Sequence, residues 1–423
     1  MVILPKLRVL AAIPVVSLTL LAMAPGCGSD SSGLANREGD AGTGIVIGDD
    51  SGATTDPTLT PIGILQGTVV APEGTIPISG ALIYLTKTEP GPIPTGAYCD
   101  KCVQLTSAAF TYSEPNGTFR LPALEEGPQF MVTQKGQFRR VRRVTVRSGD
   151  QPTTPDDNRL PGKNDAASGD TIPKMKVMQA NWDSIANSLR KLGVTEYDGP
   201  PGGFTLDRTL EDPTLLSKYH IVFIPCSGST NPELSGGPVC SGIYSPSSTG
   251  KRVMKDFIQS GGKLYVTDWS YEYVNQTWPG FIQFTGANSN EIGSACTLGS
   301  YSGDAKWGDA SLEAWMNAIG EQNAQLQKSY VGVDSTRAQA GLDEEGRSVT
   351  ITPKVWASTM ANGNPRIATV SFQDKCGRVM YSTYHAEGTD NGGSSTLLAQ
   401  EKALFHILLE VSACVGVRPE PPR

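Results

Sequence analysis

The stretch Phe257-Ile-Gln-Ser-Gly-Gly-Lys-Leu-Tyr-Val-Thr-Asp-Trp-Ser270 decides the fold of the larger part of this chain. It joins the end of an amphipathic helix, predicted over residues 249–260, to a glycine pair and then to a strand at 263–267. Another apolar strand comes before that helix, at residues 220–225. Alternation of strand, helix and strand predicts a mostly parallel sheet covered by helices on both faces.

Further elements of the same kind lie on both sides of this stretch. Strands are predicted at residues 175–180, 348–357, 365–372 and 378–384, and helices at 182–192, 212–219 and 396–411. Parallel strands align their carboxyl ends at one edge of a sheet. We therefore expect Asp268 and His385, each directly after a strand, to lie together. Residues 275–347 read as irregular apart from a helix near 311–319, and whether they form a lid is left open.

Three segments carry a family resemblance: His220-Ile-Val-Phe-Ile-Pro-Cys-Ser-Gly228, the stretch quoted above, and Gly377-Arg-Val-Met-Tyr-Ser-Thr-Tyr-His-Ala-Glu387. Together they make residues 173–416 resemble the class I glutamine amidotransferase-like fold, a flavodoxin-like α/β architecture that includes the ThuA-like proteins. In that family the turn after the strand holds a nucleophilic cysteine, and a His-x-Glu pair completes the triad. The resemblance implies a pocket or vestigial catalytic site at Asp268, Ser270, His385 and Glu387.

The turn itself departs from the family pattern, because it reads Asp268-Trp269-Ser270 without a cysteine. Thiolates are nucleophilic at modest pKa, whereas a carboxylate is not expected to take an acyl group from glutamine. We therefore predict a degenerate domain that binds a ligand or partner and is not an enzyme, with a charge-assisted Asp268–His385 contact. The alternative is a surface hydrolase of glycans or esters that uses His385 and Glu387 with Asp268 or Ser270.

Aromatic residues cluster around the same turn. Trp269 and Tyr271, with Tyr273 and Trp278 nearby, are predicted at a pocket edge. Aromatic faces there can stack on sugars, and such residues are equally often part of a core. A glycan and an envelope protein are the partners that remain open.

Residues 61–148 have a different pattern, with period-two apolar residues and regular turn signals. Six strands are predicted, at 64–70, 81–87, 103–113, 117–121, 129–134 and 138–147, which suggests a β-sandwich. The segments Gly67-Thr-Val-Val-Ala-Pro-Glu-Gly74, Ile78-Ser-Gly-Ala-Leu-Ile-Tyr-Leu85 and Asn116-Gly-Thr-Phe-Arg-Leu121 resemble the carboxypeptidase-regulatory-like (prealbumin-like) module. The resemblance implies a spacer or adhesion role.

Two charged or polar segments flank the end of this module. The run Arg139-Arg-Val-Arg-Arg143 suits a charged sheet edge, a contact with the acidic second domain or a site for anionic groups. Residues 149–172 are rich in Gly, Asp and Pro and are predicted to be a solvated linker. Their acidic residues lack the alternate spacing of an EF-hand loop.

The N-terminus predicts an exported, lipid-anchored protein. Residues 1–26 combine Lys6 and Arg8 with an apolar run, as in a signal peptide, and Ala-Pro-Gly-Cys27 resembles a bacterial lipobox. Cys27 is thus the predicted lipidation site, and residues 27–60 are predicted to be a disordered tether. Gly28 favours the outer membrane by analogy with known sorting preferences. Residues 417–423 are assigned to a tail.

Composition argues against some functions, and it does not decide how the cysteines pair in disulfides. The formal charge of −7 argues against nucleic-acid binding, and three histidines leave little material for a histidine-rich metal site. No metal and no cofactor are predicted. In an exported chain, Cys99 with Cys102 and Cys226 with Cys240 are the disulfide candidates that lie close in sequence.

Overall fold

The structure is a computed structural model of the chain. It describes residues 60–100, 103, 105, 109–199, 208–227, 245–288, 291–297, 299–361, 363–387 and 396–409. The predicted signal peptide, Cys27, nearly all of the predicted tether and the tail at 417–423 lie outside these ranges, as do Cys102 and Cys240. Within the described ranges, no helix is both long and apolar enough to cross a membrane.

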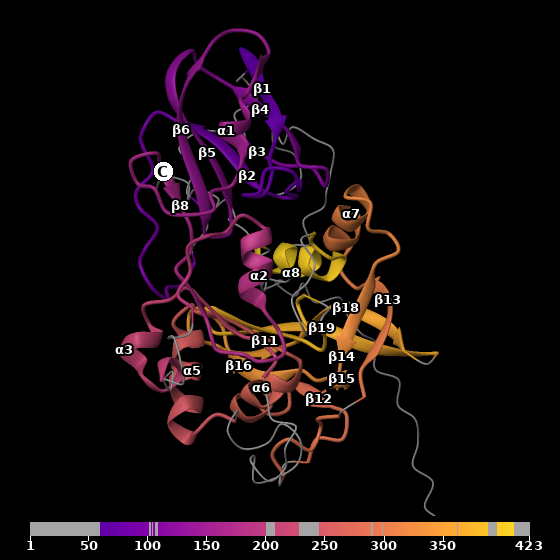
Figure 1. The fold of residues 1–423 in the computed structure, drawn as a ribbon. Helices are drawn as coiled ribbons and strands as arrows, with labels where there is room; N and C mark the ends of the chain where they lie inside the picture. Colours follow the sequence, from indigo (N-terminus) through magenta and orange to yellow (C-terminus); the bar gives the residue numbers. More distant parts are fainter. Residues whose placement is uncertain are drawn as a thin grey trace, which may run out of the picture. The chain divides into compact units, whose positions relative to one another are not determined.

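The first module consists of two β-sheets that enclose one core (Figure 1). Three strands form one sheet in the order β4-β1-β7, and five form the other in the order β3-β2-β5-β6-β8. Leu65 and Phe119 from the first sheet share a core with Ile83 and Met131 from the second. The strands are β1 (Gly63–Thr68), β2 (Leu82–Thr86), β3 (Phe110–Tyr112), β4 (Thr118–Ala123), β5 (Gly127–Lys135), β6 (Phe138–Val146), β7 (Gln151–Pro152) and β8 (Asp170–Thr171).

The predicted linker at 149–172 differs from expectation, because it is part of this module. β7 pairs with β1, β8 pairs with β6, and the short helix α1 (Pro155–Asn158) begins with a capping box at Thr154. The two strands are only two residues long, so they carry no alternation that a sequence pattern could detect.

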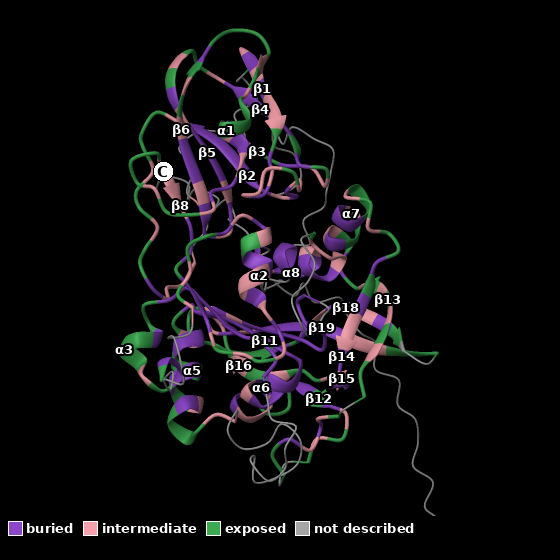
Figure 2. Cartoon of the chain, in the orientation of Figure 1, coloured by how far each residue is buried: buried purple, intermediate pink, exposed green. Residues whose placement is uncertain are grey.

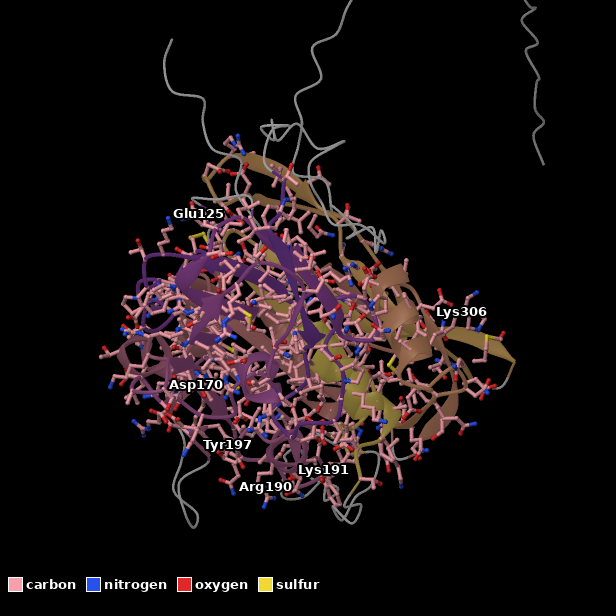
Figure 3. The ribbon with its side chains drawn as sticks, turned by 90° about the horizontal axis from the view of Figure 1, so that it is seen from above. Glu125, Asp170, Arg190, Lys191, Tyr197 and Lys306 are labelled. Atoms are coloured by element: carbon pink, nitrogen blue, oxygen red, sulfur yellow. A yellow bond between two sulfur atoms is a disulfide. The ribbon has the colours of Figure 1, made fainter. Side chains whose placement is uncertain are left out.

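The arginine run lies on β6, which is an inner strand at this point and not an edge. β6 pairs with β5 along nine residues and with β8 at Arg139 and Arg140. The guanidinium of Arg140 is buried and donates to both carboxylate oxygens of Asp170, at 2.9 and 2.6 Å. Figure 3 labels Asp170, which also pairs with Arg142 at 2.9 Å. The run therefore ties β8 to the sheet.

The second module is built on a mixed sheet of eight strands, in the order β14-β13-β18-β19-β20-β11-β10-β9. The last four are parallel to one another, and β19, β18, β13 and β14 add antiparallel pairs. The strands are β9 (Met175–Val177), β10 (Ile221–Ile224), β11 (Lys263–Thr267), β13 (Tyr301–Trp307), β14 (Gln325–Ser329), β18 (Lys354–Ala361), β19 (Asn364–Asp374) and β20 (Gly377–Ser382).

Helices cover both faces of this sheet because its inner strands are apolar on both sides. Phe223 and Tyr265 share a core with α2 and α8, whereas Val222 and Leu264 share another with α5. Figure 2 shows β11 buried between these layers. The helices are α2 (Ile185–Lys191), η1 (Thr209–Glu211), α3 (Pro213–Leu216), α5 (Ser248–Gln259), η2 (Asp268–Tyr271), α6 (Glu272–Thr277), α7 (Ala310–Ala318) and α8 (Ala399–Leu409).

Residues 275–347 are more regular than predicted. Besides α7 they supply β13 and β14, which extend the main sheet, and the small strands β12 (Ile282–Phe284), β15 (Val333–Thr336) and β16 (Gln339–Leu342). β12 pairs with β15, and β16 pairs with β17 (Ser348–Ile351). Part of this segment is thus built into the sheet itself.

The disulfides differ from the predicted local pairs. Cys99 is joined to Cys376, 277 positions away, and not to Cys102. Cys226 is a free, buried thiol, so it is not paired with Cys240. Cys296 is disulfide-bonded. Proximity in sequence misled the prediction, because folding brings the loop of the first module that carries Cys99 onto the turn between β19 and β20.

Candidate functional site

The carboxyl ends of β11 and β20 bring Asp268 and His385 together, as predicted. The two strands are parallel, with Thr267 opposite Ser382, so the residues that follow leave the sheet at one edge. His385 Nε2 lies 3.1 Å from Asp268 Oδ2. Asp268 is 0% exposed and His385 is 1% exposed. The expected contact is confirmed, and it is sealed from solvent.

Asp268 occupies a tight turn with left-handed backbone, at a φ of 43°. Aspartate and asparagine tolerate this region better than most residues, and strained positions cluster at functional sites. Its Oδ1 accepts hydrogen bonds from the backbone N–H groups of Tyr330 and Val331, at 3.0 and 2.9 Å. Burial raises the pKa of Asp268 to about 6, and His385 and these two N–H groups oppose that shift.

His385 is held from several sides. Its backbone carbonyl accepts a hydrogen bond from Gln400 Nε2 on α8, and its backbone N–H donates to Lys328 O at 3.3 Å. The ring of Tyr330 lies 5.5 Å from the imidazole, centroid to centroid. These contacts fix the ring position at the edge of the sheet.

Cys226 is the third reactive side chain at this edge, and sequence reasoning assigned it to a disulfide. It follows β10, and its Sγ lies 3.8 Å from Asp268 Oδ2. Burial raises the pKa of the thiol well above its usual range, and the charge of Asp268 adds to the shift. A thiol that stays protonated beside a carboxylate is a poor nucleophile.

Asp183 is a residue that the sequence analysis missed. Its Oδ2 accepts from Thr267 Oγ1 at 2.9 Å, and both of its oxygens accept from the backbone N–H of Ala386 at 3.0 Å. Thr267 Oγ1 in turn accepts from the backbone N–H of Cys226 at 2.7 Å. One carboxylate thus braces the backbone beside all three site residues. Its only sequence signal is an acidic residue shortly after the β9 strand.

Ser270 and Glu387 lie near the same edge, but their side chains bond to partners other than Asp268 and His385. Ser270 Oγ donates a hydrogen bond to Pro225 O at 2.7 Å, so its hydroxyl is directed at a backbone carbonyl. Glu387 pairs with Lys191 of α2 at 3.5 Å, and Lys191 also pairs with Glu401 of α8 at 2.9 Å. Figure 3 labels Lys191. Burial raises the pKa of Glu387, with Lys191 opposing the shift.

Three of the aromatic residues predicted near this turn belong to the core. Trp269, Tyr271 and Trp278 are buried. Trp269 Nε1 donates to Thr297 O at 3.2 Å, and Tyr271 OH accepts from Ala295 N at 3.1 Å. Their polar atoms therefore hold the segment that covers η2.

Comparison with known proteins gives only distant likenesses. No protein-family model matches the chain, and no curated protein matches it. A ThuA-like protein of Bacteroides uniformis is 10% identical over 56% of this chain and 90% of its own, with a TM-score of 0.31. A cytoplasmic protein of Salmonella typhimurium is 11% identical over 57% and 99%, with a TM-score of 0.32.

A beta-galactosidase of Rahnella sp. R3 is 12% identical over 57% of this chain, with a TM-score of 0.31. The chain spans only about a third of that enzyme's length, 32%. At these scores the similarity identifies no function, and the account of the fold rests on this chain's own strand order.

Proposed function

We propose that this protein is a cell-envelope lipoprotein in which a non-catalytic α/β domain binds a ligand or partner. In this proposal the β-module is a carboxypeptidase-regulatory-like spacer or adhesion unit. The second module is a degenerate amidotransferase-like domain of flavodoxin-like type, whose site lost its chemistry when aspartate replaced the cysteine of the turn. The partners are a glycan or another envelope protein.

The contacts of Asp268 carry the non-catalytic part of this proposal. One carboxylate oxygen accepts two backbone N–H groups, and the other lies against His385, with the whole residue 0% exposed. A general base or nucleophile must reach the proton or atom on which it acts. Ser270 Oγ donates its hydrogen bond to Pro225 O, and Glu387 is paired with Lys191.

The envelope location rests on the N-terminus. A lipobox-like cysteine at position 27 follows an apolar run and precedes a polar segment. Acyl chains stabilise membrane attachment by about 0.8 kcal/mol for each buried CH₂. Outer-membrane sorting follows in this proposal from Gly28.

A hydrolase remains the second candidate, because one observation favours it. Asp268 has left-handed backbone directly after a strand and lies 3.1 Å from a histidine. Strained turns of this kind hold nucleophiles in many hydrolases. The candidates differ in whether a substrate reaches this pair.

Turnover assays on the purified full chain separate the two. We expect no release of ammonia from glutamine, and no release of nitrophenol from nitrophenyl esters or glycosides, above that of heat-denatured protein. The variants are Asp268→Asn and His385→Ala, with His406→Gln as the control, a buried histidine on α8. Turnover that falls about 100-fold or more in the first two variants and persists in the control would establish the hydrolase.

Metabolic labelling with radioactive palmitate tests the anchor. The wild-type protein should take up label and fractionate with the outer membrane, and Cys27→Ser should take up none. A Cys27→Ser protein that still carries label would contradict acylation at this residue. Labelled protein found only in the inner membrane would contradict the sorting alone.

A further inference from the structure

Three different metal-ligating side chains converge at the carboxyl edge of the sheet. Cys226, Asp268 and His385 each offer one ligand atom, and the three atoms all lie within 4.8 Å of one another. Cys226 Sγ and His385 Nε2 lie 3.8 and 3.1 Å from Asp268 Oδ2. The side chains come from the ends of three adjacent parallel strands, β10, β11 and β20, so the topology of the sheet sets their spacing.

The surroundings hold each of these side chains in place. Backbone N–H groups of Tyr330 and Val331 fix Asp268 Oδ1 and leave Oδ2 directed at the other two ligands. Asp183 braces the backbone next to Asp268 and His385 through Thr267 and Ala386. Hydrogen bonds around a metal site orient the side chains that bind the ion, and losing them weakens metal binding.

The types of ligand atom at this site limit which metal ions it would prefer. Thiolate, imidazole and carboxylate together suit zinc and similar transition metals, whereas calcium and magnesium prefer oxygen ligands alone. Ligands at about 2.0–2.3 Å from a tetrahedral zinc lie about 3.3–3.8 Å apart. The distance from Asp268 Oδ2 to Cys226 Sγ, 3.8 Å, already lies at the upper end of that range. The distance from Asp268 Oδ2 to His385 Nε2, 3.1 Å, reaches it with a shift of a few tenths of an ångström.

We propose that Cys226, Asp268 and His385 bind one zinc ion, or a transition-metal ion of the same ligand preference. The thiol releases its proton to solvent as the ion binds, and the thiolate and carboxylate then balance the two positive charges. Water or a small anion completes the tetrahedron. Burial of all three ligands gives the ion the role of locking the ends of β10, β11 and β20, whether or not the site has any catalytic activity.

Metal analysis of the full chain, purified in detergent from zinc-supplemented cells, tests the proposal. We expect about one zinc ion per chain, measured by inductively coupled plasma mass spectrometry. Cys226→Ser and Asp268→Asn should each lose most of it. The matched control is His406→Gln, since His406 is buried on α8, stacks on Trp315 and is not one of the three ligands, and it should keep the full amount. Zinc that remains equal in wild type and Cys226→Ser would overturn the assignment.

Cobalt substitution gives a readout that does not depend on whether the variants fold. Cobalt bound by a thiolate produces a charge-transfer band in the near ultraviolet. The spectrum of the cobalt-loaded wild-type protein should show this band, and no variant is needed to see it. Wild-type protein without this band and with less than about a tenth of an equivalent of metal would refute the site. The cluster would then be a simple Asp–His pair with a packed thiol.

Discussion

Asp268 is the residue on which the carboxyl edge of the sheet depends. In metal-free buffer, Asp268→Ala should lower the free energy of unfolding by about 3–5 kcal/mol, because it leaves His385 and two backbone N–H groups without their acceptor. Asp268→Asn keeps an acceptor and tolerates the left-handed backbone, so it should cost only about 1–2 kcal/mol. Urea unfolding measures both. Equal losses in the two variants would contradict this account of the turn.

His220 gives a pH-dependent prediction at the same scale. Its Nδ1 accepts from the backbone N–H of Lys174 at 2.8 Å, and its Nε2 lies 2.9 Å from Pro94 O, which suits the neutral ring. Burial lowers the pKa of His220, with the charge of Lys263 adding and Asp100 opposing. The unfolded chain therefore binds the proton more readily. The stability due to this histidine is present above its ordinary pKa of 6.5 and is lost as the pH falls.

His220→Gln isolates this contribution. The wild-type stability minus that of the variant should decrease from pH 7.5 to pH 5 in urea unfolding. The raised pKa values of Asp268 and Glu387 act in the opposite direction, and they cancel because both proteins contain them. A difference that is flat or rises toward low pH would show that His220 is not held neutral.

At the scale of elements, the short strand β8 is fixed by charge. Asp170→Ala leaves the buried guanidinium of Arg140 without its carboxylate and should cost about 3–5 kcal/mol in urea unfolding. The control is Asp150→Ala, since Asp150 forms an exposed pair with Arg120 at 3.7 Å. That variant should cost less than about 1 kcal/mol. Similar losses in both would mean that β8 does not depend on this pair.

The same elements show what could be predicted from the sequence. The apolar residues of β10 and β11 predicted two strands buried on both faces. The glycine pair predicted to follow the helix is where α5 ends, and Gly261 there has a φ of 105°. β7 and β8 could not be predicted, because two-residue strands have no period and are specified only by partners on β1 and β6.

Only part of the candidate site could be predicted from the sequence, because strand order is visible in a sequence pattern and contacts between distant segments are not. Alignment of parallel strands was enough to place Asp268 beside His385. The roles of Asp183, Cys226 and Tyr330 depend on hydrogen bonds between segments far apart in the chain. Glu387 has the His-x-Glu spacing from His385, but its carboxylate pairs with Lys191, which lies on a helix far away in the sequence. Spacing along a chain does not specify such partners.

At the scale of the whole described chain, the loop around residues 94–100 ties the first module to the second. The disulfide Cys99–Cys376 and the ion pair of Asp100 with Lys263 at 2.8 Å join it to strand ends of the main sheet. At Gly261, an added Cβ would lie 1.8 Å from Tyr98 O, which shows how closely the backbones approach. This loop is therefore joined to the second module by a covalent bond and by an ion pair.

Removing the disulfide tests that connection. Cys99→Ser with Cys376→Ser should lower the free energy of unfolding by about 2–4 kcal/mol, since the crosslink closes a long loop in the unfolded chain. A non-reducing peptide map of the wild-type protein should contain the peptides of Cys99 and Cys376 joined together. Finding Cys99 joined to Cys102 would contradict the structure.

The central claim is that the Asp268–His385 edge is sealed, and the thiol of Cys226 reports on it directly from 3.8 Å away. The decisive measurement is the rate at which iodoacetamide modifies Cys226, followed on its own peptide in chelator-containing buffer. We expect modification at least about 100-fold slower in the native protein than in urea, because the reagent must wait for local opening. Native modification at the rate of the unfolded chain would mean that an open cleft reaches Asp268 and His385, and would contradict the account.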